Sequence, residues 1–241
     1  MIKRLILPAA ILGAMVLLLV PEVPAYQGGP VANGGSITGV VKFTGKPPAS
    51  RKVKVTKDKK VCGAQQVVER VKVNKTNSGL KFVVVSLVDI KKGKAMASAT
   101  ASLDQRGCVF NPYVVLLDAG GSLGILNSDK ILHNIHTYSR RNPSLNIAHP
   151  KFKKKITKKF TKPEIVKITC DVHKWMEGWL VVMDHPYYVV TDDNGAFKLS
   201  DVPAGTYKLQ VWHPALGKQT RQITVKPKQA VKVNFKLKAR K

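Results

Sequence analysis

Short runs of alternating or apolar residues, separated by turn residues, recur along the chain. Examples are SITGVVKF at residues 36–43, EIVKITC at 164–170 and AVKVNFKLK at 230–238. Successive side chains of a β-strand point to opposite faces, so this alternation predicts strands with one buried face. No segment has a convincing helical period over ten residues or more. The chain is therefore predicted to be all-β and to form two β-sandwiches.

The N-terminus has the pattern of an export signal. Lys3 and Arg4 precede an apolar run at residues 5–20, and small residues follow up to Ala25. This order predicts a signal peptide at residues 1–25 that is cleaved after Ala25. A retained anchor is the alternative, although the apolar run is slightly short for a membrane span. In either case the protein is expected to be exported, to the periplasm or another extracytoplasmic space.

Basic residues far outnumber acidic ones. The chain has 41 lysines and arginines against 14 acidic residues, a formal net charge of +27. Such a charge usually indicates nucleic acid or an anionic surface as partner. Because export removes nucleic acid, we expect an acidic protein or an anionic envelope polymer. The segment KFKKKITKK at 151–159 is then either a docking patch for that partner or a solvated face.

The chain has three cysteines, Cys62, Cys108 and Cys170. Exported proteins normally pair their thiols in disulfides, so an odd number leaves one over. Cys170 shares the inward face of its predicted strand with Val166 and Ile168 and stands at the end of that strand. By itself, a cysteine in this position reads as a core thiol or as half of a disulfide.

The loop sequence CDVHKWM places Cys170, His173 and Met176 at three-residue steps. Thiolate and imidazole suit a soft or borderline metal; methionine sulfur is too weak a donor for structural zinc, whereas copper accepts it. Upstream, LHNIHTY supplies His133 and His136 after a predicted strand. Two histidines and a cysteine with a long axial methionine form electron-transfer copper sites. We predict copper ligation by His133, Cys170, His173 and Met176.

These motifs resemble the cupredoxin, or blue copper, family, and most of all its amicyanin- and plastocyanin-like members. The resemblance rests on the HN pair at 133–134, the strand-end cysteine and the Cys-x₂-His-x₂-Met loop, and it spans about residues 98–185. It implies a Greek-key β-sandwich and selects His133 over His136 as the ligand. It also implies that Asn134 ties the two ligand loops together. The lysine-rich segment 151–162 departs from the family pattern.

The resemblance also implies a function. Four protein ligands leave no open position on the metal, which argues for outer-sphere electron transfer between Cu(I) and Cu(II) and against an enzyme. The expected partner is an acidic redox protein such as a c-type cytochrome or a periplasmic oxidoreductase. With Cys170 as a ligand, Cys62 and Cys108 are left as a disulfide or as free thiols. The alternatives are a copper-binding or copper-delivery protein and a basic envelope scaffold with a vestigial copper site.

The C-terminal residues 186–240 resemble a second family, the carboxypeptidase-regulatory-like or transthyretin-like small β-sandwich. In that family a strand like GSITGVVKFTGKPP, here at residues 35–48, comes before a TDxxGxF turn. We therefore expect a linker at 26–35, followed by an N-terminal β segment at 36–97 that pairs with the C-terminal sandwich. The cupredoxin unit would then be inserted between the two. The alternative assigns residues 35–97 to an enlarged cupredoxin sandwich.

Several other features are expected to be structural. TDDNG at 191–195 lacks the later bidentate glutamate of a calcium loop, so it is predicted to be a hairpin turn between two strands. His149, His185 and His213 each precede a proline and are expected in turns. His136 is expected to serve the fold and not the metal.

Overall fold

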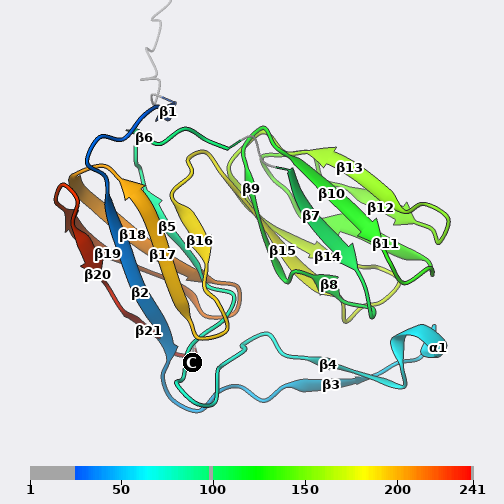
Figure 1. Ribbon diagram of the computed structural model, residues 1–241. Coiled ribbons are helices and arrows are strands. Elements are labelled where there is room, and N and C mark those ends of the chain that lie inside the picture. Colours follow the sequence, from blue (N-terminus) through cyan, green and yellow to red (C-terminus); the bar gives the residue numbers. More distant parts are fainter. Residues whose placement is uncertain (1–24, 98–99, 240–241) are drawn as a thin grey trace, which may run out of the picture.

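The computed structural model describes residues 25–97 and 100–239, and nearly all of its elements are β-strands (Figure 1). The predicted signal peptide lies outside these residues, except for Ala25. The strands form two β-sandwiches side by side, as the alternation predicts. In the described part of the chain, no helix has the length and apolar character needed to cross a membrane.

The larger sandwich is built from residues 100–183. Its strands are β7 (Thr100–Gln105), β8 (Phe110–Asn111), β9 (Val114–Asp118), β10 (Ser122–Asn127), β11 (His133–Thr137), β12 (Asn146–His149), β13 (Lys155–Lys159), β14 (Glu164–Thr169) and β15 (Glu177–Met183). One sheet has the order β13-β10-β7-β8 and the other β12-β11-β14-β15-β9. The glycine-rich turn between β9 and β10 therefore carries the chain from one sheet to the other.

The smaller sandwich combines both ends of the described chain. Its strands are β2 (Gly35–Phe43), β5 (Val84–Val88), β16 (Tyr188–Val190), β17 (Ala196–Val202), β18 (Gly205–His213), β19 (Gly217–Val225), β20 (Ala230–Lys232) and β21 (Phe235–Leu237). One sheet has the order β16-β5-β18-β19, and in the other β2 pairs with β17, β20 and β21. Side chains of β2 alternate between buried and more accessible positions, as a strand with one core face requires.

Each sandwich has its own apolar core, and a third cluster joins them. Ile37, Val211 and Phe235 are among the fully buried residues of the smaller core, and Leu117 and Ile168 are among those of the larger. The joining cluster has Val84, Val114 and Val181 at its centre. In the same cluster the rings of Trp179 and Trp212 meet edge to face at 5.4 Å. The two sandwiches thus share an apolar contact.

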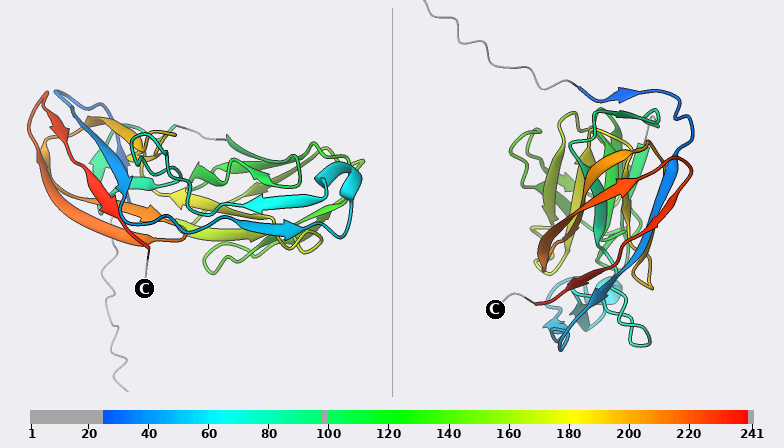
Figure 2. Two further views of the ribbon diagram at one scale, coloured as in Figure 1. Left: turned by 90° about the horizontal axis from the view of Figure 1, so that it is seen from below. Right: turned by 90° about the vertical axis from the view of Figure 1, so that its left-hand side faces the viewer.

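Two short pairs of strands complete the fold. β1 (Gln27–Gly28), inside the predicted linker, pairs in parallel with β6 (Lys92–Gly93). β3 (Arg51–Lys54) and β4 (Gln65–Val68) form an antiparallel hairpin whose tip carries a one-turn helix, α1 (Lys59–Cys62). This hairpin leaves the smaller sandwich and runs along the larger one, with α1 at its far end (Figures 1 and 2).

The prediction of a hairpin turn at TDDNG is wrong. The turn joins β16 to β17, and these strands belong to opposite sheets of the smaller sandwich. Alternation identifies each strand but not the sheet that it joins, which explains the error. The turn is closed locally, because Asp192 Oδ1 accepts hydrogen bonds from the N–H groups of Asn194 and Ala196.

The prediction that the histidines before proline lie in turns is wrong for His149 and His213. His149 ends β12 and His213 ends β18, and both side chains are fully buried. His185 lies in the bend between β15 and β16 and is buried as well. A residue before proline is pushed towards extended conformations, so a strand end suits it as well as a turn does.

Gly39 in β2 tests the pairing of the two chain ends. A Cβ atom at this position would lie 1.8 Å from the carbonyl oxygen of Val233, which is 194 residues further along the chain. We expect Gly39→Ala to destabilise the protein by about 1–3 kcal/mol or more, because the C-terminal backbone must move. Denaturant unfolding measures this, with Gly29→Ala as the control, since a Cβ there meets nothing within 4 Å. Equal stabilities of the two variants would contradict the observed pairing of β2.

His213 gives the smaller sandwich a predictable pH dependence. Its Nδ1 accepts a hydrogen bond from the Ala215 N–H, its Nε2 has no partner among the described residues, and burial lowers its pKa from 6.5 to about 4. The unfolded chain therefore takes up a proton first as the pH falls. The stability from this residue is complete above about pH 6.5 and is lost towards pH 4, at most about 3 kcal/mol.

The variant His213→Asn keeps an acceptor for the Ala215 N–H but cannot titrate. Its free energy of unfolding, measured with denaturant from pH 8 to pH 4, is expected to fall less steeply than that of the parent protein. Parallel curves for the two proteins would rule out this role for His213.

Candidate metal centre

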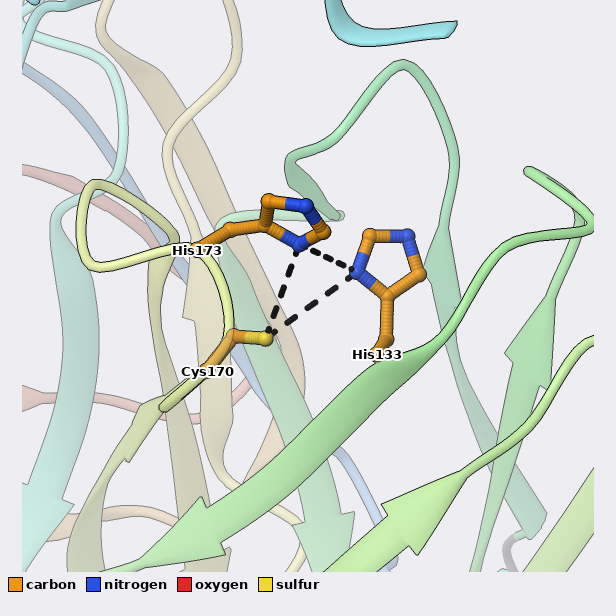
Figure 3. Close-up of side chains that lie close together, drawn as sticks. All are labelled: His133, Cys170 and His173. Atoms are coloured by element: carbon orange, nitrogen blue, oxygen red, sulfur yellow. Dashed lines mark hydrogen bonds between the residues drawn. The ribbon is translucent and has the colours of Figure 1, made fainter. Parts of the chain in front are cut away.

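Three side chains predicted from the sequence as ligands meet at one end of the larger sandwich. His133 is the first residue of β11, Cys170 directly follows β14, and His173 lies in the loop before β15. The two Nδ1 atoms are 3.1 Å apart, and Cys170 Sγ lies 4.0 Å from Nδ1 of His133 and 3.9 Å from Nδ1 of His173 (Figure 3). All three side chains are buried. The strands thus bring two imidazole nitrogens and one sulfur to a single point.

These separations can be compared with those of a metal-bound set. Bonds of about 2.0 Å to nitrogen and about 2.3 Å to sulfur, in a trigonal arrangement, would put the nitrogens roughly 3.5 Å apart and each about 3.7 Å from the sulfur. The observed distances of 3.1, 3.9 and 4.0 Å differ from these by a few tenths of an ångström. The donor set and its spacing therefore fit a soft or borderline metal ion such as copper.

A carboxylate holds the far side of each imidazole ring. Asp129 Oδ2 lies 2.9 Å from Nε2 of His133, and Asp58 Oδ2 lies 3.0 Å from Nε2 of His173. A carboxylate accepts the Nε2–H hydrogen and so favours the tautomer in which Nδ1 carries a lone pair. In the neutral rings both Nδ1 lone pairs then face the side on which Cys170 Sγ lies, which is the state that metal binding requires.

The electrostatics of the group favour a thiolate. Burial raises the pKa of Cys170, but hydrogen bonding to His133 and to backbone N–H groups outweighs it, so the pKa lies below its usual value. Burial lowers the pKa of His133, yet the hydrogen bond to Asp129 and the nearby sulfur raise it to about 9. For His173, burial lowers the pKa below 6.5. The group therefore favours the thiolate that metal binding needs, and a metal ion would displace a proton from His133.

Met176 lies in the same buried apolar cluster as Cys170 and Trp175. Its backbone closes the loop: the Met176 N–H donates to the His173 carbonyl at 2.9 Å, and the Cys170 N–H donates to the Met176 carbonyl at 3.4 Å. The short loop is thus fixed at both ends beside the cysteine. Ligation by the Met176 sulfur stays a prediction.

Asn134 and His136, which follow His133 on the same strand, have structural contacts. Asn134 Oδ1 accepts a hydrogen bond from the Asp171 N–H at 3.0 Å, which links the two ligand loops as the family resemblance implies. His136 turns away from the sulfur and pairs with the Asp171 carboxylate at 3.0 Å, with its ring stacked on Tyr138. The buried group of possible ligands thus contains His133 and not His136.

Sequence reasoning missed both carboxylates. Asp129 stands four residues before His133, a short spacing that could have suggested a contact. Asp58 comes from the separate hairpin, 115 residues from His173, and no local pattern marks it. The same hairpin carries Cys62, which forms a disulfide with Cys108, one of the two states that the sequence left open. Trp175 packs on His173 at 5.1 Å between ring centres and donates from Nε1 to the Cys108 carbonyl.

Comparisons with known proteins describe the two parts of the chain. The model of the carboxypeptidase regulatory-like domain matches residues 176–238, and no curated protein matches the chain. The match begins in the ligand loop, directly before β15 of the larger sandwich, and extends to the end of β21.

Similar solved structures include three copper-protein or cupredoxin chains. The copper-containing nitrite reductase NirK from Thermus scotoductus SA-01 is 22% identical at a TM-score of 0.32, over 42% of this chain and 25% of that one. Amicyanin from Paracoccus versutus is 14% identical at a TM-score of 0.31, over 36% and 85% of the two chains. A purple cupredoxin from Nitrosopumilus maritimus is 17% identical at a TM-score of 0.30, over 35% and 99% of the two chains.

The chain therefore spans about a quarter of the nitrite reductase. It is similar to the carboxypeptidase regulatory-like domain over residues 176–238, and part of its length is similar to solved cupredoxins.

Proposed function

We propose that the protein is an exported electron carrier that holds copper through His133, Cys170, His173 and Met176. The observation that carries this proposal is the convergence of two imidazole Nδ1 atoms and one thiol in a buried group. Copper bound there would supply a one-electron step between Cu(II) and Cu(I). The Cys62–Cys108 disulfide supports export to an oxidising compartment.

Burial favours electron transfer over catalysis or delivery of copper as cargo. The side chains of His133, Cys170 and His173 have at most 1% of their surface exposed, so a substrate has no direct approach to a metal between them. Asp58 and Asp129 hold both rings in place before any metal arrives. A fixed donor set requires little rearrangement when the charge of the ion changes, which suits an electron carrier.

The lysine-rich segment supports an acidic redox protein as the partner. His149, in β12, is the backbone neighbour of His133 across the sheet, and the segment 151–159 begins two residues later. Lys151, Lys153 and Lys154 are exposed, as is most of the segment. A partner with an acidic face, such as a c-type cytochrome, would be drawn to this end of the larger sandwich.

The first prediction of this proposal concerns the spectrum of the copper protein. The protein lacking residues 1–25, loaded with Cu(II), is expected to have an intense thiolate-to-copper absorption band and a type 1 EPR signal, because the thiolate coordinates the ion. Cys170→Ser should lose both signals. His136→Gln is the matched control and should keep both, since His136 lies outside the donor group.

A colourless copper complex whose EPR signal is the same in Cys170→Ser would contradict electron transfer at this site. Rapid loss of copper to an apo-acceptor would favour the delivery alternative. Failure to bind copper would indicate a vestigial site. Binding of such a protein to anionic envelope polymer would favour the scaffold alternative. Met176→Leu should keep the thiolate band and change the reduction potential if the thioether is the axial ligand.

The second prediction concerns the partner. Replacing Lys151, Lys153, Lys154 and Lys155 with glutamine should slow electron transfer to an acidic cytochrome by roughly tenfold or more at low salt. The difference should shrink as the ionic strength rises, because salt screens the attraction. Stopped-flow kinetics measure both effects.

The matched control replaces four exposed lysines of the smaller sandwich: Lys198, Lys218, Lys226 and Lys232. It lowers the net charge by the same amount, so it separates local docking from overall charge. Equal rates for the two quadruple variants would contradict a docking role for segment 151–159.

A further inference from the structure

A segment from outside the larger sandwich covers one of the proposed ligands. The hairpin of β3, α1 and β4, residues 51–68, extends from the smaller sandwich along the larger one (Figures 1 and 2). Its tip lies at the donor group. We call this segment the cap hairpin. Asp58 at its tip contacts Nε2 of His173, whose side chain has no exposed surface. The cap hairpin therefore lies against the outer edge of this imidazole ring.

The cap hairpin is attached to the larger sandwich by contacts other than Asp58. The Cys62–Cys108 disulfide joins α1 to the turn between β7 and β8. Gln66 Nε2 donates to the Gly107 carbonyl at 3.3 Å across the same junction. Val55 is fully buried in the apolar cluster of the larger sandwich. The tip therefore has a defined position even without the Asp58–His173 contact.

The conformation of Asp58 points to a role beyond the helix. Asp58 occupies the N-cap position of α1, where an aspartate side chain commonly accepts hydrogen bonds from backbone N–H groups. Here the side chain makes no such bond, and the residue adopts the left-handed region with φ 54°. Its carboxylate is directed to His173 instead. Asp58 thus adopts a sparsely populated backbone conformation and does not make the hydrogen bond usual for an N-cap aspartate. We take the contact with His173 as the reason for both.

We propose that Asp58 is a positioning residue for His173 and that the cap hairpin forms the outer wall of the metal centre. By accepting the Nε2–H hydrogen, Asp58 fixes the ring orientation and keeps the Nδ1 lone pair directed at Cys170 Sγ. Asp129 does the same for His133 from within the larger sandwich. The centre is therefore completed by a residue from a separate part of the chain. This inference rests on His173 being a metal ligand, as proposed above.

The test replaces Asp58 with glycine. Glycine readily adopts the left-handed region, so Asp58→Gly keeps the backbone conformation and leaves no side-chain oxygen to accept the Nε2–H hydrogen. In the metal-free protein, ¹⁵N NMR of the imidazole should show loss of the single Nε2–H tautomer of His173. The affinity for Cu(II) should fall roughly 10- to 100-fold. Asp58→Glu should recover part of both effects, because it restores a carboxylate.

The matched control is Asp89→Gly. Asp89 is exposed in the smaller sandwich and also adopts the left-handed region, with φ 60°, so the substitution is the same in chemistry and backbone but distant from the metal centre. It should leave the tautomer and the affinity unchanged. An unchanged His173 tautomer and copper affinity in Asp58→Gly would overturn the positioning role.

A second experiment tests the covering role and does not depend on metal. The double variant Cys62→Ser/Cys108→Ser releases the disulfide and leaves Cys170 as the sole thiol. In the metal-free, folded protein, a small thiol reagent should then modify Cys170 at least about tenfold faster than in the parent, where Cys170 is the sole free thiol. Equal rates would show that the cap hairpin does not shield the centre.

These readouts separate the inference from the proposed function. A tautomer change in Asp58→Gly without a type 1 copper spectrum in the parent protein would keep the positioning role and reject the electron carrier. A type 1 spectrum that is the same in Asp58→Gly, together with an unchanged tautomer, would keep the carrier and reject the positioning role.

Discussion

The donor group depends on one constraint: a polar atom removed from water needs a partner. His133, Cys170 and His173 are buried together, and the surrounding residues supply partners for the atoms that do not face the centre. Asp58 and Asp129 bind the two outer nitrogens. Nearby backbone groups also have partners, since the Asp171 N–H binds Asn134 and the Cys108 carbonyl binds Trp175. The inward-facing atoms that remain are the ones a metal would bind.

Local patterns predicted the strands and most of the donor group, because both are set within a few residues. The alternation ending at Cys170 correctly placed its side chain inside, and the three-residue step to His173 brought an imidazole back to the same point. The N-terminal ligand loop was harder, since spacing alone does not separate His133 from His136. That choice depended on resemblance, and the structure groups His133 with the sulfur because His136 is on the opposite side of β11 and binds Asp171.

Long-range pairing could not be read from the same patterns. Alternation shows that Ile37 and Val41 face a core but not which strands lie beside β2, and the turn at 191–195 was assigned to one sheet when it joins two. Asp58 illustrates the limit best: nothing in TKDKK distinguishes it from a solvated aspartate. Its role arises from the attachment of a distant hairpin, which depends on Val55 packing and on the Cys62–Cys108 disulfide.

The position of that disulfide in the chain bears on the order in which the protein matures. If the protein is exported N-terminus first, as proposed above, Cys62 and Cys108 emerge before any of the three donors, because both precede His133. The cap hairpin takes its place only when the larger sandwich folds, because its position also depends on the packing of Val55. Copper arriving after that point would meet a closed protein, and its entry would depend on brief local opening of the hairpin. Under the proposed function, a chain that folds and is oxidised before it meets copper must therefore reopen the hairpin to acquire the metal.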